Sequence, residues 1–381
     1  MDAPPTSIDD LLARMVGSGA SDLHIVPGAS PTIRVHGELA ALEGTEPAKP
    51  DETRTLLYRI LSTEQQKQLE VGRQLDFGHS VPGLGRFRVN VHFQRDSLAA
   101  AFRHIPTDLK TLHDLGLPTS LRDLAMKPRG LVLVTGPTGS GKSTTLAAMI
   151  DEVNRVKPHH ILTIEDPIEF VHRHKRCVVT QREIGADATT FAEALRAALR
   201  QDPDVILLGE MRDLETISTA LTAAETGHLV LATLHTQSAP STIDRVIDVF
   251  SPAQQEQVRM QLAGTLQGIV TQALLPTADQ GGRVACLEIL LPDDAVRNLI
   301  RQAKIEQIYS VMQTSLQRGM QTMEHGLVEL VSKRAVTIDA ALTVSSRKDE
   351  LVGMLERSGI PVTRPSAPTD SASGLRLAGS A

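Results

Sequence analysis

The spacing of hydrophobic residues divides this chain into two parts. From about Ile8 to Ile105, the pattern mixes helical spacing with the alternation of hydrophobic and polar residues that is typical of strands. Helical spacing covers residues 8–15 and 53–69. Alternation predicts strands at 22–25, 32–35 and 85–91. This first part is therefore predicted to be a small α+β domain.

From Leu131 onward, short and wholly apolar segments alternate with longer helical ones. The apolar segments are 131–134, 161–164, 205–208 and 229–234. Buried strands that alternate with helices are typical of a parallel sheet, so the second part is predicted to be an α/β domain. Pro106 to Pro118 reads as a linker, which gives domains at 1–105 and 119–355. Residues 356–381 are rich in Ser, Pro, Thr, Gly and Ala, and we expect them to be disordered.

A phosphate-binding sequence follows the first apolar segment of the second domain. It has the complete pattern G-x-x-x-x-G-K-[ST], between a predicted strand and a predicted helix. Such a loop points successive backbone N–H groups at phosphate oxygens. Lys142 is expected to reach the β- and γ-phosphates of ATP, and the Ser143 hydroxyl to ligate Mg²⁺. The predicted nucleotide-binding residues are Gly136, Pro137, Thr138, Gly139, Ser140, Gly141, Lys142, Ser143 and Thr144.

Polar side chains follow the other three apolar segments. Glu165 comes after 161–164, Glu210 after 205–208, and His235 after 229–234. Ligands of open α/β sheets bind beyond the carboxyl ends of the strands, so these groups are expected beside the triphosphate. Either glutamate could orient the attacking water, with the other near the metal; we favour Glu165 as the base and Glu210, with Ser143, near Mg²⁺. A plain turn and an ordinary helix start remain the alternatives.

Amino-acid composition narrows the possible cellular locations and partners of the protein. Of 381 residues, 41% are hydrophobic, no apolar run is long enough to span a membrane, and the first residues predict no signal peptide. The two cysteines are far apart and support neither a disulfide framework nor a cysteine zinc site, which favours the cytoplasm. A net charge of −6, with two tyrosines and no tryptophan, argues against a nucleic-acid partner.

At this point the chain resembles the secretion ATPases, and within them the type IV pilus retraction ATPases, over roughly Ile8 to Leu342. The resemblance rests on four ordered motifs, in which Gly209-Glu210 stands where many P-loop NTPases have Asp-Glu. They are similar to the family's Walker A, Asp box, Walker B and His box: 131–143, 160–170, 207–216 and 226–236. A segment at 295–302 resembles a retraction motif, with departures at Val296 and Gln302.

The resemblance implies an ATP- and Mg²⁺-dependent homohexamer, with a PAS-like first domain and a RecA-like second domain that ends in helices. It also implies an inner-membrane platform protein as partner, and a location at the inner face of the cytoplasmic membrane. Arg86, Arg88 and Arg103 match arginines of the family's first domain that reach a neighbour's nucleotide. From the residues alone, Arg86 and Arg88 share one strand face, which could also be simply solvated.

Three other functions stay open. The chain could be an accessory ATP-binding subunit that needs an active paralogous retraction ATPase, a pilus or secretion assembly ATPase, or a nucleic-acid translocase. Extension ATPases of the superfamily usually carry a longer N-terminal region and a four-cysteine zinc element. Because this chain has two cysteines, retraction is favoured over extension.

Overall fold

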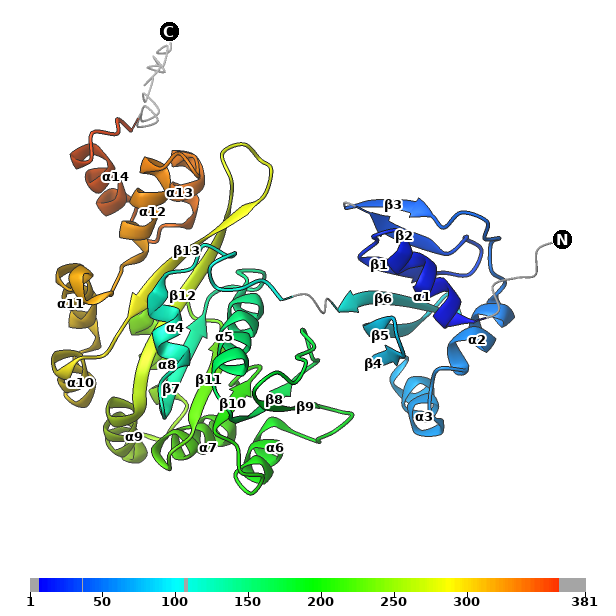
Figure 1. Cartoon of the computed structure of the whole chain (residues 1–381), viewed down its shortest axis with the longest axis horizontal. Helices are drawn as coiled ribbons and strands as arrows, with labels where there is room; N and C mark the ends of the chain where they lie inside the picture. The colour runs from blue at the N-terminus through cyan, green and yellow to red at the C-terminus, as the bar shows by residue number, and fades with distance from the viewer. Residues whose placement is uncertain (1–6, 36, 106–108, 363–381) are drawn as a thin grey trace, which may run out of the picture.

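The computed structural model describes residues 7–35, 37–105 and 109–362, which form two domains side by side (Figure 1). The first is built on a six-stranded antiparallel sheet in the order β3-β2-β1-β6-β5-β4. Its strands are β1 (Asp22–Ile25), β2 (Thr32–Val35), β3 (Glu38–Ala41), β4 (Gln74–Val81), β5 (Gly85–Gln94) and β6 (Ser97–Ile105). Its helices are α1 (Ile8–Gly17), α2 (Pro50–Tyr58) and α3 (Thr63–Gly72). The predicted α+β class of this domain is confirmed.

The helical spacing at 53–69 is confirmed, and it covers more than one helix. The structure has two helices there, because α2 ends at Tyr58 and a new cap starts α3. Ser62 Oγ accepts a hydrogen bond from Gln65 N, and the Gln65 side chain accepts one from Ser62 N. Such a reciprocal capping box specifies the start of a helix.

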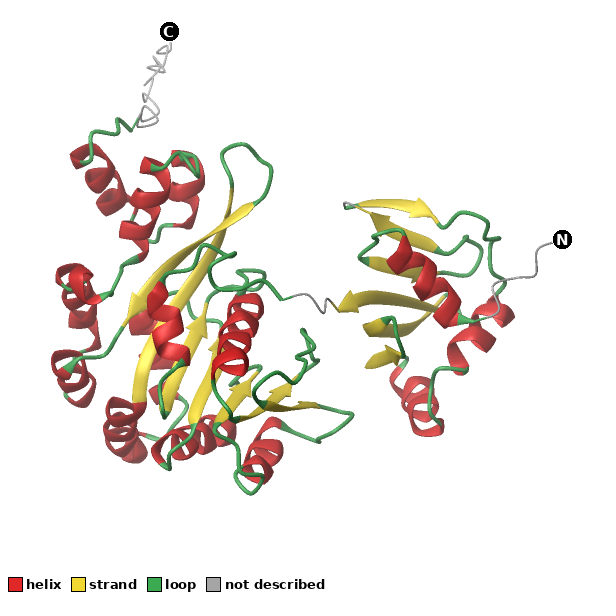
Figure 2. Ribbon diagram, viewed as in Figure 1, coloured by secondary structure: helices red, strands yellow, loops and turns green. Residues whose placement is uncertain are grey.

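The second domain is built on a seven-stranded sheet in the order β13-β12-β7-β11-β10-β8-β9. All neighbours are parallel except the hairpin of β12 with β13. Its strands are β7 (Gly130–Thr135), β8 (His160–Glu165), β9 (Val178–Glu183), β10 (Val205–Leu208), β11 (Leu229–Leu234), β12 (Leu266–Pro276) and β13 (Arg283–Leu290). Figure 2 shows helices on both sides of this sheet. The parallel α/β fold expected from residue 131 onward is confirmed.

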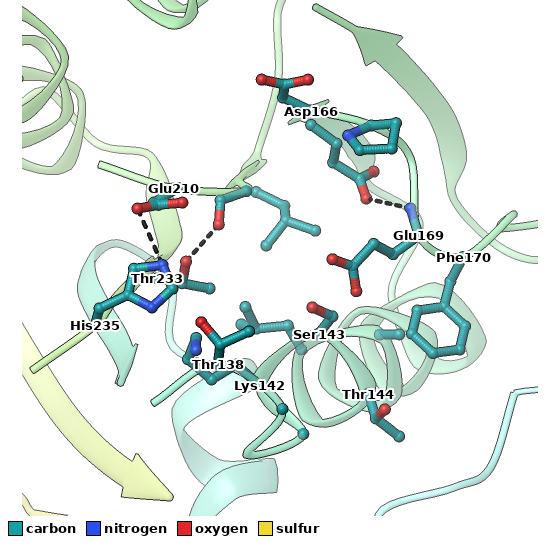
Figure 3. Close-up of a pocket in the computed structure, with 18 of the residues that line it drawn as sticks. Thr138, Lys142, Ser143, Thr144, Asp166, Glu169, Phe170, Glu210, Thr233 and His235 are labelled. Carbon is teal, nitrogen blue, oxygen red and sulfur yellow. Dashed lines mark hydrogen bonds and ion pairs between the residues drawn. The ribbon is translucent and has the colours of Figure 1, made fainter. Parts of the chain in front are cut away.

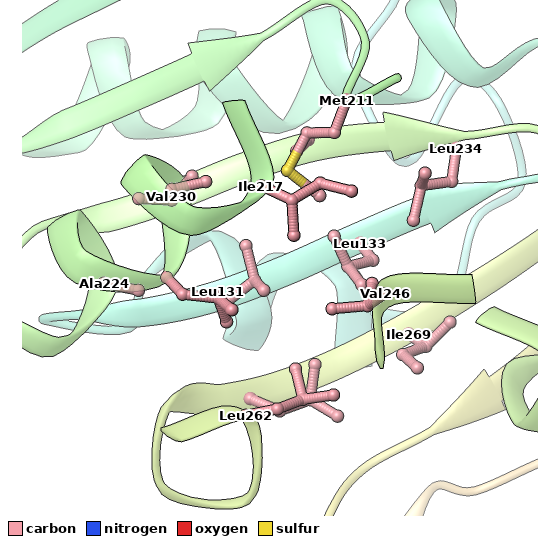
Figure 4. Packing of buried hydrophobic residues seen from close by; sticks show 14 of the residues in the cluster. Leu131, Leu133, Met211, Ile217, Ala224, Val230, Leu234, Val246, Leu262 and Ile269 are labelled. Carbon is pink, nitrogen blue, oxygen red and sulfur yellow. The ribbon is translucent and has the colours of Figure 1, made fainter. Parts of the chain in front are cut away.

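Strand β7, in the interior of this sheet, is buried on both faces. Leu131 and Leu133 of β7 pack into one hydrophobic cluster, drawn in Figure 4, and Val132 and Val134 pack into the cluster on the other face. Helices α4 (Thr119–Ala125) and α5 (Lys142–Val156) cover the second face. The first face is covered by α6 (Phe191–Ala198), α7 (Leu214–Glu225), α8 (Ala239–Asp248) and α9 (Pro252–Thr265).

The predicted linker packs largely on the second domain. Residues 106–108 lie outside the described residues, whereas Leu112 is buried in the cluster beneath α5, and Leu115 and Leu117 pack against it. Residues 112–117 therefore belong to the second domain, because their leucines bury their side chains there.

Within the described residues, five α-helices follow the sheet: α10 (Asp294–Arg301), α11 (Ile308–Thr314), α12 (Met323–Ser332), α13 (Ile338–Val344) and α14 (Lys348–Arg357). The expected disordered tail, 356–381, is wrong at its start. Helix α14 continues to Arg357, and Ile360 and Val362 pack against the cluster that α12 and α14 form on the hairpin. The remainder of the predicted tail, 363–381, lies outside the described residues.

Candidate nucleotide site

The phosphate-binding loop joins β7 to α5, as the sequence predicts. Gly136, Gly139 and Gly141 have φ of 139°, 79° and 88°, which side chains rarely adopt. At Gly136 close packing excludes a side chain in addition to the φ angle, because a Cβ there would lie 2.2 Å from the carbonyl oxygen of Gln272. The loop leads into the N-terminus of α5, where unpaired N–H groups favour a bound anion.

Gln272 of β12 braces this loop, and the sequence analysis missed it. It is buried; its Nε2 donates to Ser140 O at 2.7 Å, and its Oε1 accepts from Thr145 Oγ1 at 2.7 Å. One side chain thus ties the loop to the first turn of the helix behind it. These hydrogen bonds join positions more than a hundred residues apart in sequence, so no local sequence pattern predicts them.

The loop borders a cavity of about 370 Å³ at the carboxyl ends of the parallel strands. Lys142 is buried, and its Nζ donates to Gly136 O at 2.8 Å and Pro137 O at 3.0 Å. Burial lowers the pKa of Lys142, and the charges of Glu210 and Glu169 oppose that shift. Figure 3 shows these groups around one space. An ammonium that borders this cavity is suited to donate hydrogen bonds to phosphate oxygens.

The predicted strand-end groups come together in this cavity. Because β8, β10 and β11 are parallel, Glu165, Glu210 and His235 lie at one edge of the sheet and line the cavity. Glu210 Oε1 lies 3.1 Å from His235 Nε2 and 2.6 Å from Arg212 Nε. Burial alone would raise the pKa of Glu210, but its bonds to Arg212 and His235 outweigh burial and lower it. This carboxylate therefore stays ionised.

Glu165 has a different environment. It is buried, and its Oε1 accepts from Thr163 Oγ1 at 2.6 Å and from Gln181 Nε2 at 3.2 Å. Burial raises the pKa of Glu165, although these bonds and the Glu169 backbone amide oppose the shift. A carboxylate with a raised pKa is a stronger base once it is deprotonated.

A loop after β8 adds residues that the sequence analysis did not single out. Glu169 N donates to Glu165 Oε2 at 3.3 Å, and the Glu169 side chain points into the cavity toward Ser143 (Figure 3). Phe170 lies beside it as an apolar wall. The sequence signal for this loop is the segment Glu165-Asp166-Pro167-Ile168-Glu169, which contains three acidic residues. Of these, only Glu165 is predicted to be catalytic from the sequence.

The glycine before Glu210 also has a packing reason. A Cβ at Gly209 would lie 3.3 Å from both Glu165 Cα and Ile164 O. Gly209 N donates to Ile164 O at 2.8 Å, which holds the ends of β10 and β8 close together. A side chain in this place would therefore require the backbone at the end of β8 to shift by a few tenths of an ångström.

The predicted arginines lie outside the cavity of their own chain. Arg86 Nη2 donates to Glu183 Oε2 at 2.8 Å, and Arg103 Nε donates to Asp22 Oδ1 at 2.7 Å. Arg88 and Arg103 are cross-strand partners on an exposed part of the sheet. Like charges directly opposite each other are unfavourable, so this face is suited to an anion.

The donor set for a metal is small. Within the described residues there is no group of three or more His, Cys, Asp or Glu that could hold a metal ion. A Mg²⁺ ion that accompanies a nucleotide needs only one or two protein ligands besides phosphates and water, so Ser143 and Glu210 fit it. None of the helices described is both long and apolar enough to cross a bilayer.

Comparisons with known proteins agree with this geometry. A family model described as "Type II/IV secretion system protein" matches residues 111–342. The type IV pilus retraction ATPase PilT of Pseudomonas aeruginosa is 51% identical over 334 residues, which cover 88% of this chain and 96% of that protein. The type IV pilus ATPase PilU of the same organism is 40% identical over 348 residues, 91% of each chain.

A solved structure extends the match to the fold. The crystal structure of the pilus retraction motor PilT with bound ADP has a TM-score of 0.85 and 48% identity to this chain, and the match covers 93% of this chain and 100% of that one. The similarity includes both domains, and its identity is far above the level at which only a fold is shared. This chain belongs to the type II/IV secretion system protein family, in the branch of the type IV pilus retraction ATPases.

Proposed function

We propose that this chain is one subunit of a homohexameric motor that hydrolyses ATP to retract a type IV pilus. The observation that carries the proposal is a complete phosphate loop facing two glutamates with opposite pKa shifts across one cavity. Phosphoryl transfer to water needs positioning, charge neutralisation and a group that orients the water, and this cavity offers all three. The relatives PilT and PilU support the pilus as the object of the motor.

The surroundings of the residues support the roles that we propose for them. Lys142 binds the β- and γ-phosphates, and Ser143 and Glu210 would hold Mg²⁺, which would neutralise charge on the phosphate oxygens. Glu165 orients and deprotonates the attacking water, since its raised pKa suits a base. His235, 3.1 Å from Glu210, responds to the γ-phosphate through that carboxylate. Arg86 and Arg103 reach the nucleotide of a neighbouring subunit.

The partners are the other subunits of the ring, an inner-membrane platform protein, and a paralogous retraction ATPase of the PilU type. The motor works in the cytoplasm, against the inner face of the cytoplasmic membrane. Nucleic acid is not a partner, which agrees with the net charge of −6.

An ATPase assay on the purified protein tests the enzyme. We expect turnover with Mg²⁺-ATP and a loss on the order of a hundredfold in Lys142→Ala, because a positioned charge on the transferring group is removed. Lys304→Ala, on an exposed lysine remote from the cavity, is the control. No turnover by the wild type would favour the accessory function, and stimulation by DNA would favour a translocase.

Deleting the gene tests the direction of the motor. A retraction motor predicts cells with surplus surface pili and no twitching motility. Cells without pili would instead indicate an assembly ATPase.

A further inference from the structure

One ion pair joins the two domains, and the mechanism above leaves it without a role. Arg86 of β5 donates from Nη2 to Oε2 of Glu183, the last residue of β9, at 2.8 Å. Glu183 is 2% exposed, although it belongs to an edge strand of its sheet. A buried carboxylate is costly without a compensating charge, so the docked first domain stabilises this group.

The first domain is shaped for this contact. A Cβ at Gly78 of β4 would lie 2.2 Å from Arg86 Nη2 and 2.6 Å from its Cζ. The absence of a side chain at Gly78 therefore provides the space in which the guanidinium lies. Arg86 Nη1 donates to Ser80 Oγ at 3.1 Å, which orients the group further.

On the other side, Glu183 holds the loop that borders the nucleotide cavity. Its Oε2 also accepts from Ile168 N at 3.1 Å. Glu165 and Glu183 are partners in the β8–β9 ladder, and Glu165 accepts from Glu169 N at 3.3 Å. Two neighbouring carboxylates thus bind successive amides of one loop, and the first of them is the proposed base.

We propose that Arg86 and Glu183 form an interdomain latch, which holds the first domain against its own ATPase domain and positions the 166–170 loop. The latch opens when Arg86 moves to the nucleotide of a neighbouring subunit, a step that rests on the proposed function. Arg86 then has two competing acceptors, Glu183 and the nucleotide of the neighbouring subunit. Docking of the first domain affects Glu165 of the same subunit, because the 166–170 loop contacts both Glu183 and Glu165. Glu183 is a positioning residue in this scheme and touches no nucleotide.

Distances between the domains test the latch. Spin labels at Val71→Cys and Met260→Cys, which are 87% and 57% exposed, report on the first and second domains. The native Cys177 and Cys286 are buried, so they are protected from labelling. The distance between the two labels is measured by pulsed electron paramagnetic resonance in the absence of nucleotide. The labelled protein is diluted about tenfold into unlabelled protein, so that one ring rarely contains several label pairs.

Two variants should change the distance distribution by different routes. Glu183→Gln removes the charge, and Gly78→Ala displaces the Arg86 side chain while both charges remain. We expect the dominant wild-type distance to lose at least half of its population in each variant. Gly72→Ala, in the same domain with open space around its Cα, should match the wild type. An unchanged distribution in both Glu183→Gln and Gly78→Ala would overturn the latch.

The opening of the Arg86–Glu183 latch by ATP is tested in a separate measurement of the same distance. In a Glu210→Gln background, Mg²⁺-ATP should reduce the docked population of an otherwise unchanged chain. If the docked population stayed constant with ATP bound, the proposed release would be wrong. Failure of the proposed function would appear elsewhere, as an absence of turnover by the wild type with Mg²⁺-ATP, so the two failures are distinguishable.

Discussion

Two glutamates at neighbouring strand ends differ in how their charge is maintained. Glu210 is held ionised by Arg212 and His235, whereas burial raises the pKa of Glu165. The parallel strands that place them are evident in the apolar segments of the sequence, and so is the phosphate loop. The environments that separate their pKa values are not, because the burial of Glu165 and the contact of Glu210 with His235 arise only when the strands assemble.

Glutamine variants should separate binding from chemistry. Glu165→Gln and Glu210→Gln keep the shape of each side chain, so both should bind a fluorescent ATP analogue within about threefold of the wild type. Turnover should fall by a factor of about a hundred or more in each, since a base or a charge near the metal is lost. Loss of analogue binding in either variant would assign that glutamate a structural role instead.

The pH profile should identify the base. Turnover requires deprotonated Glu165, whose pKa is raised, so activity should fall as the pH decreases and reach half its maximum above 4.5, the ordinary pKa of a glutamate. Glu210, with a lowered pKa, would place that midpoint below 4.5. A midpoint below 4.5 in the steady-state rate would therefore exchange the two assignments.

Among the elements, strands were easier to predict than helix ends. The four apolar segments correspond to β7, β8, β10 and β11, with each boundary correct to within one residue. The break between α2 and α3 was missed although Ser62-Thr63-Glu64-Gln65 is a capping-box sequence. The tail boundary was missed because two hydrophobic side chains, Ile360 and Val362, find a partner surface that no local pattern shows.

The segment that resembles a retraction motif is helix α10, and it has a structural role. Val296 and Ile300 are buried, and Arg297 is directed at the end of α9. Arg297 donates from Nη1 to Ala263 O and from Nη2 to Leu266 O, the latter at 2.9 Å. One arginine thus satisfies carbonyls that a helix C-terminus leaves unpaired.

Arg297→Ala should therefore lower the stability of the second domain. Two hydrogen bonds from a charged donor are lost, which costs about 2–4 kcal/mol and lowers the melting temperature by several degrees. Differential scanning calorimetry measures the change. Arg301→Ala, on the same helix and exposed, is the matched control and should melt with the wild type. Equal melting of both variants would exclude the capping role.

For the whole molecule, the arrangement of the two domains was the least predictable feature. The resemblance placed arginines of the first domain at a neighbour's nucleotide, while within one chain Arg86 contacts Glu183. Nothing local in the sequence pairs these residues, because the contact depends on how two separately folded units meet. The proposed site for the arginines can be tested only in an assembled ring.

Mixed rings provide that test. An inactive Arg86→Ala/Arg103→Ala variant and an inactive Glu210→Gln variant should regain part of the wild-type activity when combined. Some interfaces would then join intact arginines to an intact Glu210, as an arginine supplied in trans requires. Native mass spectrometry confirms that mixed rings form. Mixed rings with background activity would show that the arginines do not act across the interface.

The burial of β7 on both faces has a consequence for how fast its amides exchange with solvent. A strand sealed between two hydrophobic clusters can exchange only when the domain opens globally, whereas surface loops exchange through local opening. Deuterium uptake at 131–134 should therefore be the slowest in the domain, with or without nucleotide. Protection by nucleotide should appear in segments that border the cavity, such as the loops at 136–141 and 166–170, so the sheet serves as a rigid frame within which the loops respond.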